Sequence, residues 1–230
     1  MLKLEDVLIV QGDFRMQADL TLEAGRKYAV IGPSGAGKST LLGALCGFVP
    51  LSGGRMFWED RDISNAAPSA RPMTMLFQDN NLFPHLSVLQ NVGLGLRPDL
   101  RLTAQERDKV EEALARVDLS NFAKVKPGTL SGGQQSRVAL ARVLVQARPL
   151  VLLDEPFAAL GPALRNEMLA VVQDTVAQTG AAMVMVTHAP EDVRRIADEV
   201  IFVEGGRARA PRPAAALMDD PPPELRAYLG

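Results

Sequence analysis

The chain has 230 residues, enough for one large domain or two small ones, and folding should bury roughly 70% of the surface that the unfolded chain exposes. With 25 Lys and Arg against 27 Asp and Glu, the formal net charge is −2, so no global positive field draws the chain to nucleic acid. Hydrophobic residues at 47% and charged residues at 23% exclude a disordered chain. We expect a folded protein with no nucleic-acid partner.

The start of the chain and its single cysteine indicate the cellular compartment of the protein. Residues 1–6 include the charged Lys3, Glu5 and Asp6 and show no apolar core of a secretion signal. Cys46 is the only cysteine and has apolar neighbours, which predicts a buried thiol in a reducing compartment. The longest apolar runs, such as 181–186, fall far short of the ~20 residues of a membrane-spanning helix. We therefore expect any membrane association to go through a partner or a surface.

The first third of the chain is predicted to be rich in strands. Residues 3–10, 18–22 and 27–31 have strand character, and residues 38–48 have the composition of a helix. Because the third strand leads through a glycine cluster into that helix, we predict half of a βαβ unit here.

Helical spacing replaces the strands between residues 82 and 145. Residues 103–106 form a capping box, and Val110, Ala113, Leu114 and Val117 follow on one face of the predicted helix. This stretch is typical of a helical insertion into an α/β body.

The α/β pattern then resumes with an apolar strand at 150–153. The predicted elements that follow are a helix ended by Gly180, a strand, a short helix and a last strand, at 163–178, 181–186, 191–197 and 200–203. Strands buried on both faces and alternating with helices predict a mostly parallel sheet. Past Gly206, arginines alternate with Ala and Pro, which predicts an exposed tail.

A glycine-rich segment between strand 27–31 and helix 38–48 fits the pattern G-x-x-x-x-G-K-[ST] in the context that this pattern requires. Its backbone N–H groups converge on phosphate oxygens, and the helix N-terminus adds partial positive charge. Lys38 neutralises the β- and γ-phosphates, and Ser39 offers its hydroxyl to Mg²⁺. The alternative, a glycine-rich turn with an incidental lysine, is disfavoured by the complete motif. The predicted phosphate-binding residues are Gly32, Pro33, Ser34, Gly35, Ala36, Gly37, Lys38, Ser39 and Thr40.

Two carboxylates follow the apolar strand at 150–153. Asp154 is placed to hold hydrated Mg²⁺ beside the phosphate loop, and Glu155 to accept a proton from an attacking water. A strand that ends in Asp-Glu is a weak signal alone. Together with the phosphate loop it favours a nucleotidase that uses water.

A second glycine pair begins a further predicted helix. Ser131, the amides of Gly132 and Gly133, and the following Gln134 form a second anion site. One nucleoside triphosphate does not need two distant cradles in one chain. The simplest explanation is a symmetric dimer in which this cradle of one subunit closes over the nucleotide of the other. In isolation the segment would be interpreted as an N-capped helix with glycines for close packing.

With Leu-Ser-Gly-Gly-Gln at 130–134, the chain resembles the ATP-binding subunits of ATP-binding cassette (ABC) transporters over nearly its whole length. The resemblance assigns Gln78 to the loop whose glutamine touches Mg²⁺ and the attacking water and relays to the membrane partner. It assigns His188 as the switch histidine that contacts the γ-phosphate and orients the base. A strand-end histidine that caps backbone groups is the alternative for His188.

The resemblance also implies a fold and a division of the chain. The fold is α/β, a P-loop NTPase core with a mostly parallel sheet, an N-terminal antiparallel β subdomain and an inserted α-helical subdomain. Residues 1–230 form a single ABC ATPase domain. Its parts are a nucleotide-binding core at 1–78 and 146–206, a helical subdomain with the signature motif at 79–145, and a C-terminal tail at 207–230.

Cofactors and partners follow from the same resemblance. ATP and Mg²⁺ are expected, with the metal at Ser39, Gln78 and Asp154. The expected partners are a second copy of the chain, transmembrane permease subunits and, indirectly, a periplasmic solute-binding protein. The subunit is expected to lie peripherally on the cytoplasmic face of the bacterial inner membrane.

An apolar segment beyond Gln78 is predicted to be a docking surface for another protein. It carries Leu82, Phe83, Leu86 and Val88 with little sequence nearby to cover them. In the family this region receives a coupling helix from the permease. The alternative is that these residues pack inside the helical insertion.

In closer detail the chain is similar to the ATPase subunits of bacterial thiamine importers, in residues 1–4, 32–42, 75–78, 80–83, 91–96, 130–142 and 162–165. We therefore expect the motor of an importer for thiamine or thiamine phosphates. The alternatives are an importer ATPase for a metal ion, polyamine, sugar or oxyanion, and a non-transport ABC ATPase. A chromosome ATPase would need a long coiled coil, and a kinase or GTPase would not explain residues 130–134.

Two departures from the family pattern carry expectations of their own. Gln11 stands where an aromatic residue usually stacks on adenine, at a cost of about 1 kcal/mol of nucleotide affinity, with Phe14 as a candidate substitute. Residues 158–161 read Ala-Ala-Leu-Gly instead of Ser-Ala-Leu-Asp, so Gly161 removes a carboxylate that makes polar contacts across the dimer. Communication between the two ATP sites is expected to be looser, in an enzyme that is still active.

Overall fold

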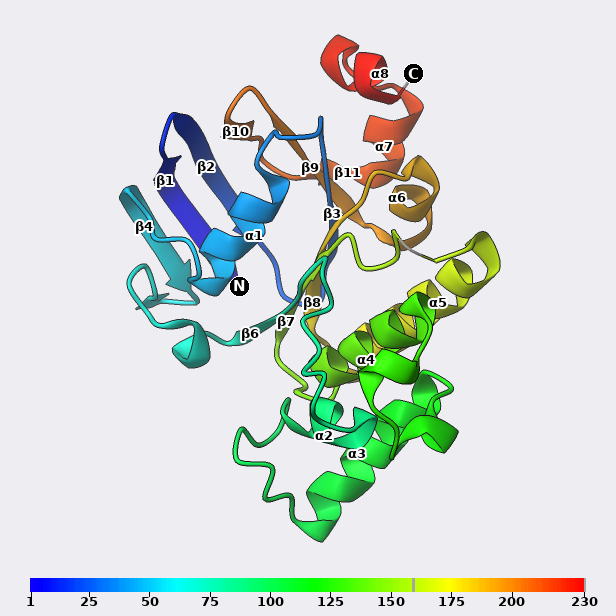
Figure 1. Ribbon diagram of the computed structural model, residues 1–230. Coiled ribbons are helices and arrows are strands. Elements are labelled where there is room, and N and C mark those ends of the chain that lie inside the picture. The colour runs from blue at the N-terminus through cyan, green and yellow to red at the C-terminus, as the bar shows by residue number, and fades with distance from the viewer. Residues whose placement is uncertain (159, 230) are drawn as a thin grey trace.

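The computed structural model describes residues 1–158 and 160–229, with side chains through residue 226. Ala159, within the departing segment 158–161, and Gly230, at the end of the predicted tail, lie outside the described residues. The described strands form one sheet in the order β5-β4-β1-β2-β10-β9-β3-β8-β7-β6, with β11 paired to β9. Helices lie on both sides of this sheet (Figure 1).

One half of the sheet is antiparallel and holds the N-terminal strands. These are β1 (Leu2–Gln11), β2 (Phe14–Leu22), β4 (Gly53–Trp58) and β5 (Arg61–Asp62). Alternate residues of β2 are buried because one face of this half lies on the core and the other faces solvent. The predicted antiparallel β subdomain is thus confirmed, although β4 and β5 were not predicted from the sequence.

The other half of the sheet is mainly parallel. Its parallel strands are β6 (Met73–Leu76), β7 (Leu150–Asp154), β8 (Ala182–Val186), β3 (Lys27–Ile31) and β9 (Glu199–Glu204). Every residue of β7 and β8 is buried, as expected for strands covered on both faces. The short β10 (Arg207–Ala208) pairs with β2 and β9 and so joins the two halves.

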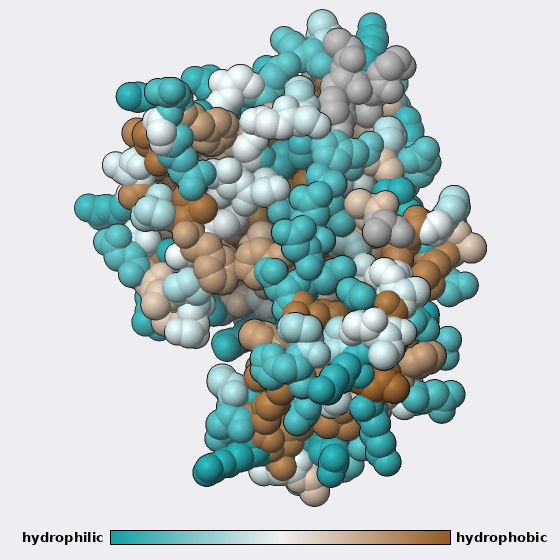
Figure 2. Space-filling view, in the orientation of Figure 1, coloured by the Kyte–Doolittle hydropathy of each residue, from teal (hydrophilic) through white to brown (hydrophobic). Residues whose placement is uncertain are grey.

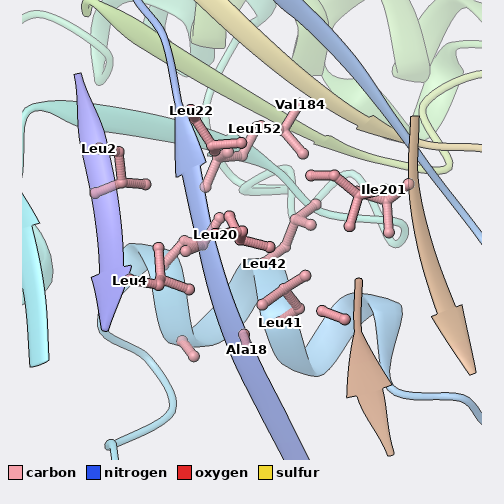
Figure 3. Packing of buried hydrophobic residues seen from close by; sticks show 14 of the residues in the cluster. Leu2, Leu4, Ala18, Leu20, Leu22, Leu41, Leu42, Leu152, Val184 and Ile201 are labelled. Carbon is pink, nitrogen blue, oxygen red and sulfur yellow. The ribbon is translucent and has the colours of Figure 1, made fainter. Parts of the chain in front are cut away.

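The two faces of the parallel half carry different helices. Leu150 and Leu152 of β7 belong to the same hydrophobic cluster as α1 (Lys38–Cys46), and Figure 3 shows Leu41 and Leu42 of α1 among Leu20, Leu152 and Val184. Val151 and Leu153 belong to the cluster that contains α4 (Gly132–Leu144) and α5 (Pro162–Thr179). Because successive strand side chains point to opposite faces, α1 and α4 lie on opposite sides of the sheet.

The predicted helical stretch contains α2 (Val88–Gly93), α3 (Ala104–Arg116) and α4, with short 3₁₀ turns at Ser120–Phe122 and Pro127–Thr129. The capping box at Thr103 and Glu106 is confirmed. Val110 and Leu114 are buried on the predicted face of α3, and Val117, its C-cap residue, is buried as well. This helical part projects from the sheet in Figure 1.

The predicted exposed tail is only partly correct: Arg207, Arg209 and Arg212 are exposed, but the segment is folded and packs on the core. Residues beyond Gly206 form β10, β11 (Arg212–Pro213), α7 (Ala214–Asp219) and α8 (Pro223–Leu229). They pack on α6 (Pro190–Ile196) and β9, with Leu217, Met218 and Leu225 buried. These three apolar side chains show no helical or strand periodicity in the sequence, because prolines lie between them. They nevertheless cover apolar residues of β9 and α6. No helix in the described residues is long and apolar enough to cross a membrane.

Candidate functional site

The predicted phosphate, metal and catalytic segments meet at one edge of the parallel strands. Val186 of β8 is in register with Val30 of β3 and with Asp154 of β7, and Leu153 is in register with Leu76 of β6. The phosphate loop, Gln78, Glu155 and His188 each come just after one of these strand ends. Such an edge is where open α/β sheets bind their ligands.

The phosphate loop is pressed against the strands beneath it. A β-carbon on Gly32 would overlap the carbonyl oxygen of Val203, and one on Gly37 would overlap the ring of Phe14. Gly37 has φ 98° and is the N-cap of α1, where no side chain of the described residues caps the helix and no acidic residue occupies the first turn. The first N–H groups of α1 are thus available for an anion.

Lys38 is held inside this loop. Its side chain is 5% exposed, and Nζ donates hydrogen bonds to the carbonyl oxygens of Gly32 (2.8 Å) and Pro33 (2.9 Å). Burial lowers the pKa of Lys38, and the carboxylates of Glu155 and Asp154 oppose that shift. The ammonium group therefore lies inside the curve of the phosphate loop.

Ser39 and Asp154 form the second part of the site. The Ser39 hydroxyl donates to Oδ1 of Asp154 at 3.0 Å, and Asp154 is 5% exposed. Burial raises the pKa of Asp154, while the Ser39 hydrogen bond and Lys38 oppose the rise. A hydroxyl and a carboxylate oxygen at this separation, beside the phosphate loop, fit the oxygen ligands that Mg²⁺ prefers.

Glu155 and His188 form a direct pair. Nε2 of His188 lies 2.7 Å from Oε1 of Glu155, and their side chains are 38% and 20% exposed. Glu155 has φ 47°, a left-handed backbone that is uncommon outside glycine, and its N–H donates to the carbonyl oxygen of Val186 at 3.2 Å. The pair lines a cavity of about 300 Å³ into which Arg165 and Asp192 also face. A carboxylate held in this way is suited to accept a proton from water.

Gln78 follows β6 and is exposed, and the residues after it form hydrogen bonds with α4. The Arg142 guanidinium donates to the carbonyl oxygens of Asn80 (2.7 Å) and Asn81 (2.8 Å). Nδ2 of Asn80 donates to the Ser136 hydroxyl at 3.2 Å. These contacts were not predicted from the sequence. The Asn-Asn pair was the available signal, since both residues have positive φ and Asn tolerates that conformation.

Ser131 and Gln134 form a complete capping box at the start of α4. The N–H of Gln134 donates to the Ser131 hydroxyl (3.3 Å), and the N–H of Ser131 donates to Oε1 of Gln134 (2.9 Å). Because α4 and α1 lie on opposite sides of the sheet, one chain does not bring this segment to Lys38. A β-carbon on Gly133 would lie 3.2 Å from the Leu160 side chain, so this glycine allows close packing. Apart from its chain neighbours, a β-carbon on Gly132 would meet no atom of the described residues within 4 Å.

The predicted docking segment is partly buried. Val88 is 0% exposed and belongs to the helical cluster, so the prediction is wrong for Val88, while Phe83 is 45% exposed. A second exposed apolar residue, Phe48, was not predicted from the sequence. It is 55% exposed, and its ring lies 5.3 Å from that of Phe77. In the space-filling view, hydrophobic residues reach the surface at several places over the helical part (Figure 2). An exposed apolar surface therefore exists next to Gln78.

The two residues that differ from the family pattern, Gln11 and Gly161, lie at a strand turn and at a helix start. Gln11 pairs with Phe14 across the β1–β2 turn, and the Phe14 ring packs on Gly37 of the phosphate loop. Gly161 is the N-cap of α5, with an extended backbone and no side-chain cap among the described residues.

Comparisons with known proteins agree with this geometry. The family model described as ABC transporter matches residues 16–158. The thiamine import ATP-binding protein ThiQ of Cereibacter sphaeroides is 58% identical over 230 residues, and ThiQ of a Ruegeria species is 55% identical over 230 residues, with full coverage of both chains in each case. A solved dimeric ATP-binding cassette bound to ADP and Pi, in a post-hydrolysis state, is 28% identical with TM-score 0.83 and covers 93% of this chain and 99% of its own. A nucleotide-free cassette shares the fold, with TM-score 0.87, 24% identity and coverage of 100% and 99%.

The fold and the site together define a P-loop ATPase of the cassette type. The chain belongs to the ABC transporter family and is one of its ATP-binding subunits.

Proposed function

We propose that this subunit is the ATP-hydrolysing motor of an importer for thiamine. The observation that carries the motor function is the pairing of Glu155 with His188 at the sheet edge that also holds Lys38, Ser39 and Asp154. The solute rests on the curated relatives, which are named thiamine import ATP-binding proteins over the full length of this chain.

In this proposal the nucleotide phosphates bind to residues 32–40, with Lys38 neutralising the β- and γ-phosphates. Ser39, Asp154 and Gln78 hold Mg²⁺, which supplies charge neutralisation of the phosphate oxygens. Glu155 takes a proton from the attacking water. His188 contacts the γ-phosphate and fixes the direction of the Glu155 carboxylate, a role that fits their 2.7 Å contact.

The site is completed by a second copy of the chain. Residues 131–134 of one subunit close over the triphosphate that the other subunit holds, which gives each nucleotide an anion site on two sides. Because closure depends on the γ-phosphate, ATP favours the closed dimer and hydrolysis favours reopening. The exposed, capped start of α4 supports this arrangement.

The dimer drives a permease through the surface of Phe48 and Phe77, which lies next to Gln78, and through the exposed Phe83 further along the same segment. In functional terms, residues 1–78 and 146–206 act as the nucleotide core and residues 79–145 as the helical part that moves with the signature segment. The subunit sits peripherally on the cytoplasmic face of the inner membrane, and the periplasmic solute-binding protein acts on it only through the permease.

Uptake of labelled thiamine by cells lacking this gene tests the solute. We expect uptake to be lost, to return with the wild-type chain, and not to return with Glu155→Gln. Unchanged uptake in deleted cells that have no second thiamine route would reject thiamine and leave another small solute as the cargo. ATP hydrolysis by the purified chain tests the motor separately.

A further inference from the structure

A buried carboxylate lies just beyond His188, on α6. Asp192 is 4% exposed, and its Oδ2 accepts hydrogen bonds from the Thr187 hydroxyl (3.0 Å) and from Nε of Arg165 on α5 (3.1 Å). Nη2 of Arg165 also donates to the same oxygen. A carboxylate this deeply buried is tolerated because a cation and a hydroxyl satisfy it.

Thr187 connects Asp192, through hydrogen bonds, to the backbone on both sides of His188. Its side chain is 4% exposed, and its hydroxyl donates to Asp192 while accepting the N–H of Ala189 at 3.1 Å. The N–H of Thr187 donates to the carbonyl oxygen of Val30, at the end of β3. The backbone before and after His188 is therefore fixed by one hydroxyl and one carboxylate.

Arg165 ties the same cluster to α5. It lies in the first turn of that helix, with its N–H bonded to the carbonyl oxygen of the N-cap residue Gly161. Two further contacts join α5 to α6, from Arg195 to Asn166 (2.7 Å) and from Gln173 to the carbonyl oxygen of Arg195 (3.0 Å). Arg165 and Asp192 also line the cavity of Glu155 and His188. The cluster is thus continuous with the proposed catalytic pair.

We propose that Asp192 and Thr187 are positioning residues for ATP hydrolysis, which hold His188 in contact with Glu155, and that Arg165 anchors Asp192 to α5. This inference rests on the proposed function of Glu155 and His188. Small displacements of a catalytic group reduce turnover strongly, because the reacting atoms must be aligned, while nucleotide binding by the phosphate loop does not depend on that alignment.

Thr187→Val is the sharpest variant, because it removes the hydroxyl at nearly constant volume. We expect kcat for ATP hydrolysis to fall by about 10-fold or more, while KM and the Kd for ATP change by less than about twofold. Thr187→Ser, which keeps the hydroxyl, should retain kcat within about threefold of wild type. The readouts are phosphate release at saturating Mg²⁺-ATP and ATP binding to the same preparations.

Thr175→Val is the matched control for loss of a buried threonine hydroxyl. Thr175 is 7% exposed, and its hydroxyl donates to the carbonyl oxygen of Val171 within α5, away from the site. A structural role alone predicts equal losses of kcat for the two valine variants. Equal losses, or wild-type kcat in Thr187→Val, would overturn the proposal.

Asp192→Asn gives a second test that does not depend on Thr187→Val folding. It should lower kcat with unchanged KM, and combining it with Arg165→Gln should cost less than the product of the two single effects, because both act through one cluster. Independent, multiplicative effects would contradict the proposal. Failure of the wild-type chain to hydrolyse ATP would instead reject the proposed function itself.

Discussion

The two predicted anion-binding segments of this chain are built in opposite ways. At the sheet edge, Lys38 and Asp154 are each 5% exposed and are held by the phosphate loop and by Ser39. At the start of α4, Ser131 is exposed and is held by its own capping box. The comparison suggests a rule for composite sites. Groups proposed to act inside the subunit are fixed by the rest of the chain, whereas groups proposed to act on a second copy are ordered by local hydrogen bonds and are exposed.

Glu155→Gln should have the largest effect on the sheet edge. The substitution keeps the shape of the side chain and removes the proposed proton acceptor, so hydrolysis should fall by about 10²–10⁴-fold while ATP still binds. Phosphate release and nucleotide binding measure the two properties. Glu111→Gln, at an exposed position of α3, is the matched control and should retain full activity. A Glu155→Gln chain that hydrolyses ATP at the wild-type rate would remove Glu155 from the mechanism.

Asp154→Asn should have opposite effects on ATP hydrolysis and on the stability of the nucleotide-free fold. Because Asp154 is the proposed ligand of Mg²⁺, its loss should remove several kcal/mol of transition-state stabilisation, and hydrolysis should fall by about 10²-fold or more. Burial raises the pKa of Asp154, so its ionised form destabilises the nucleotide-free fold, and that penalty appears as pH rises through the raised pKa.

At neutral pH, Asp154→Asn should therefore unfold at a higher urea concentration than wild type. This difference between the two urea midpoints should become smaller at acidic pH, where Asp154 of the wild type is protonated. Urea unfolding of the nucleotide-free proteins at the two pH values measures this. A variant less stable than wild type at neutral pH would show that the carboxylate stabilises the fold.

Ser131→Ala tests the other side of the comparison. Loss of the N-cap should reduce the free energy of unfolding by about 1 kcal/mol, and the same loss is expected for Thr103→Ala, which removes the equivalent cap of α3. Only Ser131→Ala should weaken ATP-dependent association of two chains, measured by sedimentation in the Glu155→Gln background. Equal association of the two variants would show that Ser131 acts only as a helix cap.

Gly161→Asp should have the smallest effect. Gly161 is the N-cap of α5 and its β-carbon position is open, so an aspartate there should cap the helix and add about 0.3–0.5 kcal/mol to the free energy of unfolding. The restored carboxylate is also expected to raise ATPase activity or its cooperativity in the assembled transporter. Unchanged stability, turnover and Hill slope would show that position 161 has neither role.

Local patterns were sufficient to predict much of the molecule. The phosphate loop and the capping box at Thr103 depend on residues a few positions apart, and the structure places them as expected. The capping box at Ser131 was not predicted, although the alternative interpretation of that segment as an N-capped helix is consistent with it. The boundaries of α5, predicted at 163–178, are found at Pro162–Thr179, with Gly180 at its left-handed end.

Contacts between distant segments were not predictable in the same way. The burial of Leu217 and Leu225 depends on the surface that β9 and α6 offer, and no local period encodes it. The link from Arg165 to Asp192 exists because α5 packs beside α6. Strand β6 has only four residues, too few to show a clear alternation.

The central claim is that the phosphate loop of one chain and the start of α4 of another form one ATP site. Mixing an Ala36→Cys chain with a Ser131→Cys chain, both carrying Glu155→Gln, tests it with a bifunctional thiol reagent. Native Cys46 is buried, and burial raises the pKa of its thiol to about 12, so it should not react. We predict a covalent dimer in the mixture with Mg²⁺-ATP, and none from either chain alone or without nucleotide. Absence of that dimer in ATP, or an internal cross-link when one chain carries both cysteines, would contradict the account.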